Sequence, residues 1–228
     1  MFEKIEVLDT VKHKNTSFDE VPYEEIAKHI GSIPLGFGEV INMAPYCPII
    51  ISGKKEHLEF VAFTGLNTNI SIFLNPVPYI PNYVKTYPFI NAVLVDKKGL
   101  RKDVIGIIKS EFVGKNKQHS IFGKEKELEP LSHQKIEQIR TLNRQREISK
   151  KIIKELEKYD LLEKKDFKVC FKEETRVVLD DFYILNRAKL MQLDDSLLAL
   201  WAKKGWITLL DIHLKSIDNF PKIIATAK

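Results

Sequence analysis

The sequence has little cysteine and no long hydrophobic run, and both absences narrow the class of protein. Only two cysteines, Cys47 and Cys170, occur among 228 residues, and they form no Cys-x-x-Cys pair. This usage predicts two buried free thiols in a reducing compartment, and nothing in the sequence supports a disulfide between them. No segment approaches the roughly 18 continuous apolar residues of a membrane-spanning helix. We therefore do not expect an integral membrane protein.

A secretory signal is also missing from the first residues. The segment Met1–Asp9 has no basic stretch followed by an apolar run, which is the pattern of a cleaved signal. We therefore expect a cytoplasmic protein, while export without a cleaved signal remains an open alternative.

The familiar catalytic and cofactor-binding motifs are absent. The six histidines include no pair at the i, i+4 spacing of a helical zinc site. Neither the Gly-x-Ser-x-Gly of hydrolases nor the phosphate-binding Gly-x-x-x-x-Gly-Lys-Ser/Thr occurs. The pair Gly36-x-Gly38 lacks the third glycine of a dinucleotide-binding loop. We expect no catalytic residue, no cofactor and no metal, although an enzyme of unknown class remains open.

Charge is spread along the chain rather than concentrated. The formal net charge is +5, and 29% of the residues are charged. Lysines alternate with glutamates over residues 124–127, which indicates a solvated surface rather than a phosphate-binding stripe. We therefore expect no nucleic-acid partner. A protein partner fits this surface better, and a homo-oligomer remains open.

The first half of the chain has the apolar pattern of antiparallel strands. Two hairpins are predicted, one over Tyr46–Gly65 with a turn at 53–56 and one over Phe89–Ile108 with a turn at 96–99. Shorter predicted elements are a strand over residues 2–8, a helix within Asp19–Ile30 and a strand at Ser71–Leu74. These elements predict an antiparallel sheet at the centre of residues 1–130.

The second half is predicted to be mainly helical. Ser132 is expected to cap a long helix that runs to about Tyr159, and a hairpin with a turn at 172–174 follows. Helices over Leu197–Lys204 and Trp206–Phe220, the latter closed by Pro221, form a C-terminal pair. The fold class is therefore α+β, with a long helix packed on an antiparallel sheet. We expect segments 1–130 and 131–228 to form one compact unit.

The stretch Tyr79–Phe89 combines aromatic side chains with backbone constraint. Pro81 suits the first position of a helix, and Pro88 keeps Tyr87 out of helical geometry, so a helix of barely two turns is predicted. Tyr83 and Tyr87 are four residues apart and share one face. Such a short helix is unstable alone in water. Burial of the tyrosines predicts a packing role, and the alternative is that their hydroxyls line a recognition surface.

The candidate recognition residues come from three parts of the chain. They are Tyr79, Tyr83, Tyr87, Phe89, His13 and His213. Among these, the apolar neighbours of His213 are typical of a buried, hydrogen-bonded imidazole. On the long helix, the residues 143–146 place cations where they either face an anionic ligand or form surface ion pairs with neighbouring acids.

Several segments in a fixed order together carry a family resemblance. They are Leu8 with His13, Pro34-Leu35 with Glu39, Pro48-Ile49-Ile50, Gly65-Leu66, Tyr79-Ile80-Pro81 with Tyr83, Tyr87-Pro88-Phe89, Phe182-Tyr183, Leu190, Leu193, Gly205 and His213-Leu214-Lys215-Ser216. With these segments the chain resembles the bacterial SapC family, the surface-array protein C family. The segment from Tyr79 to Phe89 is the most specific. The chain departs from the family pattern shortly before Tyr79-Ile80-Pro81, where a tryptophan after a glycine is expected and the chain instead has the shorter connection Leu74–Pro78.

The resemblance implies an association with the paracrystalline surface layers of Gram-negative bacteria, and it brings no catalytic or ligand-binding residues with it. One hypothesis is thus a non-catalytic protein of the surface layer or of its assembly, located at the cell surface. A second is an intracellular accessory protein that binds a partner or small ligand. The third is an enzyme of unknown class.

Overall fold

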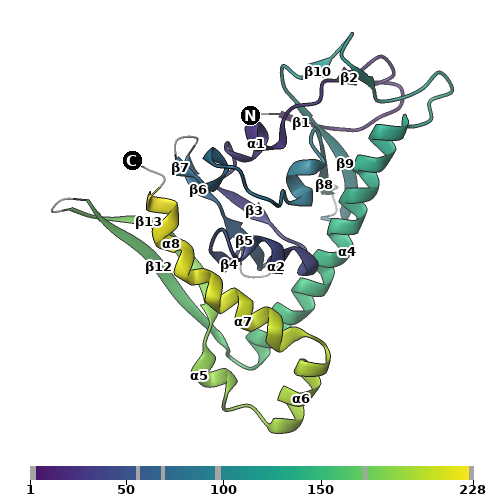
Figure 1. Ribbon diagram of the computed structural model, residues 1–228. Coiled ribbons are helices and arrows are strands. Elements are labelled where there is room, and N and C mark those ends of the chain that lie inside the picture. Colours follow the sequence, from purple (N-terminus) through teal and green to yellow (C-terminus); the bar gives the residue numbers. More distant parts are fainter. Residues whose placement is uncertain (1–3, 55–56, 68–69, 96–98, 172–173, 226–228) are drawn as a thin grey trace.

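The computed structural model describes residues 4–54, 57–67, 70–95, 99–171 and 174–225, and for residues 67, 169–178 and 224 only the backbone. Antiparallel sheets combine with one long helix and a set of C-terminal helices (Figure 1). The α+β class predicted from the sequence is therefore confirmed. The predicted turns at 53–56, 96–99 and 172–174 fall partly on residues outside these ranges.

The largest sheet has five strands in the order β12-β13-β4-β5-β3, and every pair is antiparallel. Its strands are β3 (Ser32–Pro34), β4 (Ile49–Ser52), β5 (Glu59–Phe63), β12 (Leu162–Phe171) and β13 (Glu174–Leu185). The predicted hairpins are thus present as β4–β5 and β12–β13. The link between them is the pairing of Tyr183 with Ile51. Both sequence segments, 1–130 and 131–228, therefore contribute strands to one sheet.

A second sheet has three strands in the order β1-β9-β8 and contains the other predicted hairpin. Its strands are β1 (Lys4–Val7), β8 (Phe89–Val95) and β9 (Arg101–Lys109). The remaining strands of the described residues form two small sheets. One consists of β10 (Val113–Gly114), β2 (Ser17–Phe18) and β11 (His119–Ser120), and the other of β6 (Gly65–Asn67) and β7 (Ile70–Ser71).

Helices connect and cover these sheets. The helices before residue 100 are α1 (Tyr23–Ala27), α2 (Val40–Met43) and α3 (Asn82–Lys85), with 3-10 turns at Phe37–Glu39 and Ile72–Leu74. Those after residue 100 are α4 (Pro130–Lys158), α5 (Arg187–Leu190), α6 (Asp195–Lys203), α7 (Trp206–Ser216) and α8 (Phe220–Ala225), with a 3-10 turn at Ile217–Asn219. Between α6 and α7 the chain reverses at Gly205, whose φ of 73° is favourable only without a side chain.

Three local predictions were wrong, each because of short-range backbone chemistry. Ser71–Leu74 is mostly a 3-10 turn rather than a strand, since the Ser71 hydroxyl accepts from the Phe73 N–H and folds the chain back. The N-cap of α4 is Glu129 rather than Ser132, because Pro130 lacks an N–H and suits the first helical turn. Pro221 lies at the start of α8 for the same reason, instead of ending the preceding helix.

Helix α4 joins the two larger sheets. It contacts β5 of one sheet and β8 of the other, and also α3 and the 3-10 turn at Phe37–Glu39. Its 29 residues correspond to a length of about 43 Å, and it runs along one side of the molecule (Figure 1). Apolar side chains recur along its buried face, at Ile136, Ile139, Leu142, Ile152, Ile153 and Leu156. Among the described residues, no helix is long and apolar enough to cross a membrane.

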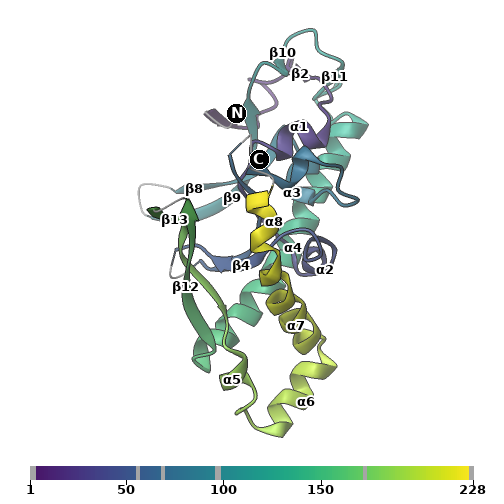
Figure 2. The ribbon, with the colours of Figure 1, turned by 60° about the vertical axis from the view of Figure 1, so that its left-hand side comes forward.

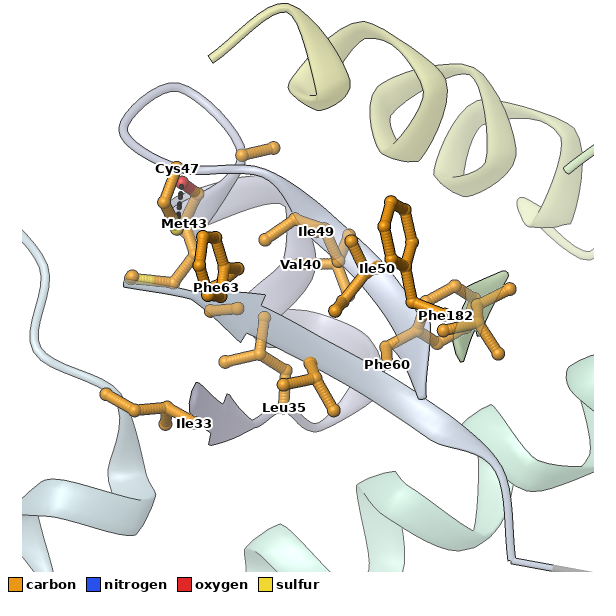
Figure 3. Close-up of a cluster of buried hydrophobic side chains, with 14 of the residues drawn as sticks. Ile33, Leu35, Val40, Met43, Cys47, Ile49, Ile50, Phe60, Phe63 and Phe182 are labelled. Atoms are coloured by element: carbon orange, nitrogen blue, oxygen red, sulfur yellow. Dashed lines mark hydrogen bonds between the residues drawn. The ribbon is translucent and has the colours of Figure 1, made fainter. Parts of the chain in front are cut away.

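The main core lies between the five-stranded sheet and the helices packed on it. Figure 3 shows β4 and β5 side chains such as Ile49 and Phe60 meeting Val40 of α2 and Phe182 of β13. Cys47 is fully buried there as a free thiol, with its Sγ 3.7 Å from the carbonyl oxygen of Met43. Burial raises the pKa of this thiol far above its usual value. The predicted buried state of Cys47 is confirmed, and the side chain of Cys170 lies outside the described atoms.

We expect segments 1–130 and 131–228 to unfold together, because β13 completes the sheet of β4 and β5. The background for the test is Cys170→Ser, which leaves Cys47 as the single thiol of the chain. Tryptophan fluorescence reports the second segment, since Trp201 and Trp206 both lie there, and labelling of Cys47 reports the first. Equal urea midpoints for fluorescence and labelling are expected. Separate midpoints would show two independently stable lobes.

Candidate functional site

The predicted short helix exists as α3, a single turn rather than nearly two. It begins after Pro81 and ends at Thr86, and the Tyr87–Pro88 peptide bond that follows is cis. α3 packs against α4 and α1 (Figure 2). The four candidate aromatics of this stretch therefore lie at the meeting point of three helices.

A buried carboxylate holds the start of this stretch in place. Glu39 is only 2% exposed. Its Oε1 accepts from the Tyr79 hydroxyl at 2.9 Å and from the Asn82 N–H at 2.7 Å, while its Oε2 accepts from the Gly36 N–H at 3.0 Å. No described cation pairs with this carboxylate, so its charge is balanced by these three donors alone.

The loop that carries Glu39 lies directly against α4. A Cβ atom added to Gly36 would come within 2.7 Å of the Cβ atom of Gln145, which cannot rotate away, so a larger residue would require the loop to shift from the helix. Loop 36–39, α3 and α4 are therefore mutually constrained, and the Glu39 carboxylate is the centre of the arrangement.

Each tyrosine of the stretch has a different environment. Tyr79 is half-buried, with the Lys85 ammonium 4.9 Å from its ring centroid, and burial together with the nearby Glu39 charge raises its pKa well above the usual range. Tyr87 is 4% exposed, with its hydroxyl 2.5 Å from the Ser110 Oγ. Burial also raises the pKa of both Tyr83 and Tyr87. All three phenols are therefore protonated and uncharged at physiological pH.

Tyr83, Tyr87 and Phe89 border one small apolar void, although Tyr87 lies beyond the end of α3 and so does not share a helix face with Tyr83. Phe89 is buried and meets the edge of Phe18, with ring centroids 5.6 Å apart. Tyr83 also borders a second space that contains Asn143 and Arg146 of α4. The aromatic stretch and the cationic residues of the long helix thus belong to one region.

A cleft of about 560 Å³ opens beside Arg146, between α4, β5 and the β8–β9 hairpin. Its lining is mostly charged and includes Glu59, Arg101, Asp103, Arg144, Arg146 and Glu147. The cleft shares Asn91, Asn143 and Arg146 with the space that Tyr83 borders. Tyr83 therefore borders a small space next to the cleft, although it is not one of the residues that line the cleft itself.

Two of the arginines that line the cleft, Arg101 and Arg144, take no part in its ion pairs. Arg146 donates to Glu59 Oε2 from its Nε at 2.9 Å and its Nη2 at 2.5 Å. Lys150 pairs with Glu147 and holds the pKa of that carboxyl below its usual value. The Nη2 atom of Arg144 donates to the Thr141 hydroxyl at 3.0 Å. The Nη1 atom of Arg101 lies 2.6 Å from the Nε2 atom of His57. Within the described part of the chain, neither of these two arginines forms an ion pair with a carboxylate.

The two candidate histidines lie elsewhere. His13 is 5% exposed and sits beside Glu6, whose pKa is lowered to about 2 by the ammonium groups of Lys109 and Lys12. His213 is fully buried on α7 and accepts from the Leu185 N–H at 3.2 Å. Burial lowers its pKa to about 4, so it is a neutral part of the core, as its neighbours in the sequence indicate.

The described residues contain no group of three or more His, Cys, Asp or Glu side chains placed to hold a metal ion. Sequence reasoning missed the central place of Glu39 and the cleft residues from β5 and β9. It also missed Lys135, which is 5% exposed on α4. A signal for Lys135 was available, since it lies three or four residues from the apolar positions Leu131 and Ile139 of the buried face.

Comparison with known proteins gives one match. A family model described as SapC matches residues 8–223 of the chain. No curated protein and no solved structure matches it.

We expect Glu39→Gln to destabilise the fold more than Tyr79→Phe. An amide in place of the carboxylate turns a donor toward the Gly36 N–H or toward the Asn82 N–H, and leaves a buried donor unsatisfied, with a loss of about 2–3 kcal/mol. Tyr79→Phe removes one of three donors, with a loss of about 1 kcal/mol. Urea unfolding measures both, with the exposed Glu24→Gln as a control. Equal losses for the two buried-site variants would contradict the central role of Glu39.

We expect His213 to make the fold less stable at low pH. Its pKa is about 4 in the folded chain and about 6.5 when exposed, so protonation favours the unfolded state. Well above pH 6.5 the free energy of unfolding is not lowered by this imidazole, and it falls by roughly 3 kcal/mol as the pH drops to 4. Urea unfolding across this range should show a smaller loss for His213→Gln, and an unchanged loss for the exposed His29→Gln. An identical pH dependence for His213→Gln would refute the assignment.

Proposed function

Because the chain belongs to the SapC family, we propose that it is a non-catalytic protein of a bacterial surface layer or of its assembly. We also propose that it binds a protein partner in the cleft beside α4. The family's association with surface arrays supports the first part. The geometry of the cleft, with guanidinium groups along its walls and the small space bordered by Tyr83 next to it, supports the second.

The observation that carries the proposal is the pair Arg101 and Arg144. Both line the cleft, both are exposed, and neither forms an ion pair with a described carboxylate. Arginine forms paired hydrogen bonds with carboxylates in a planar, directional geometry. The partner is thus a protein segment that carries Asp or Glu side chains spaced to meet these two groups.

The charges in the cleft favour recognition over proton transfer. General acid–base catalysis works best when the catalytic pKa lies near the working pH. The Glu147 carboxyl is shifted the other way, to a lower pKa, by Lys150, and Arg146 is engaged with Glu59. Fixed charges of this kind orient an incoming segment and raise its association rate without taking part in chemistry.

The second candidate is an intracellular accessory protein that uses the same cleft. The free, buried thiol of Cys47 supports it, because unpaired cysteines are typical of reducing compartments. Fractionation of the native organism separates the two. Cytosolic protein, together with an unaltered surface array after deletion of the gene, would support the accessory protein and overturn the surface-layer proposal.

We expect charge reversal in the cleft to abolish partner binding. The variant is Arg101→Glu with Arg144→Glu, and its matched control is Arg187→Glu, an exposed arginine on α5 outside the cleft. Wild type and control should capture the same surface-layer protein from the native organism. Titration calorimetry with that purified protein should show at least tenfold weaker binding by the double variant.

The salt dependence of binding provides a second measure. Wild-type affinity should fall as ionic strength rises, because exposed charges are screened within about 10 Å at 0.1 M salt, and the residual binding of the double variant should depend on salt much less. Equal affinity of the double variant and wild type would exclude the cleft as the binding site.

A further inference from the structure

A second cavity, separate from the cleft, lies on the other side of the Tyr79–Phe89 stretch. It has a volume of about 380 Å³ and is bordered by residues 18–24, Ile26, Tyr87 and Lys135. This size is within the range of small-molecule sites, roughly 300–1,000 Å³. Tyr87 lines this cavity, whereas Tyr83 does not and borders the small space beside the cleft.

The cavity contains a buried ammonium group without a counter-charge. Lys135 is only 5% exposed, and its Nζ donates to the Lys85 carbonyl oxygen at 2.8 Å. Its Nζ also lies 5.5 Å from the centroid of the Tyr23 ring. No described carboxylate pairs with it. An ammonium has three donors, and burial of a charge is unfavourable unless it is paired and hydrogen-bonded.

The surroundings of the ammonium confirm that its charge is poorly balanced. Burial lowers the pKa of Lys135, and the more distant Glu20 carboxylate opposes this only in part. The carbonyl of Lys85 is a neutral acceptor. A bound anion would supply the missing partner for the donors that face the cavity.

The other walls of the cavity define the kind of anion. Tyr23, Tyr87, Val21 and Ile26 supply aromatic and aliphatic surface for an apolar body. Acidic side chains at Asp19, Glu20 and Glu24 also border the cavity. They repel any anion, and one with two charges more strongly than one with a single charge, so a phosphate or a dicarboxylate fits less well than a monoanion.

We propose that this cavity binds a small monocarboxylate with an apolar or aromatic body. The carboxylate accepts hydrogen bonds from the Lys135 ammonium, and the body lies between Tyr23 and Tyr87. This site is independent of the partner cleft, because the two share no lining residue and the cavity uses none of the cleft arginines.

The first experiment measures binding of three probes to the full chain by titration calorimetry: phenylacetate, 3-phenylpropionate and hexanoate. At least one should bind saturably. 2-Phenylethanol, the neutral counterpart of phenylacetate, and inorganic phosphate should each bind at least tenfold more weakly. Absence of saturable binding for all three carboxylates overturns the proposal, and so does equal affinity for 2-phenylethanol.

The second experiment tests Lys135 itself. Lys135→Met keeps the length of the side chain and removes its charge, and Lys151→Met, an exposed lysine of the same helix, is the control. Carboxylate affinity should fall at least tenfold in Lys135→Met and change less than twofold in Lys151→Met. The preference for phenylacetate over 2-phenylethanol should also disappear in Lys135→Met, which a purely structural lysine would not cause.

A third variant keeps the proposal testable if Lys135→Met does not fold. Glu20→Gln removes one exposed carboxylate from the cavity wall. Carboxylate affinity should then rise about two- to threefold, because a repulsion is removed. An unchanged or weaker affinity for the carboxylates in Glu20→Gln counts against binding beside Lys135.

Discussion

The arrangement of this molecule depends on a carboxylate that is buried without a cation. Among the described residues no cation pairs with Glu39, and its carboxylate accepts hydrogen bonds from two backbone N–H groups and one phenol, which come from the loop at Gly36 and from the residues around Pro81. Such a group tolerates little movement of its donors, because each lost hydrogen bond leaves charge in an apolar interior. It therefore sets the position of α3 against α4, and with it the directions of Tyr83 and Tyr87.

The regular parts of the fold could be predicted from the sequence because their signals are local. The hairpins β4–β5 and β8–β9 follow from alternating apolar residues around short polar turns, and α4 follows from a long stretch free of proline and glycine. The pairing of β13 with β4 could not be predicted, since it joins residues far apart in the sequence. The start of α8 at Phe220–Pro221 was missed because proline suits both the end and the beginning of a helix.

In the candidate sites too, features with a local signal in the sequence could be predicted, and features that join distant residues could not. A neutral, buried His213 follows from its apolar neighbours, whereas the helix face expected to carry both Tyr83 and Tyr87 is not formed, because α3 ends before Tyr87. The charged lining was harder to foresee, because Glu59, Arg101 and Arg144 come from three separate elements. Lys135 and Arg146 both occupy positions of α4 that continue the apolar stripe, at steps of three and four residues through Ile139 and Leu142. Polar residues within a buried stripe are thus the pattern that marks both cavities.

The pairing of β13 with β4 also has a consequence for synthesis on the ribosome. Strands β4 and β5 leave the ribosome early, whereas residues 174–185 emerge only after α4. Until then one edge of β4, in the run Ile49–Ser52, has unpaired backbone groups and apolar side chains that another chain could join. The nascent protein therefore exposes this edge to aggregation from the time β4 leaves the ribosome until residues 174–185 have emerged.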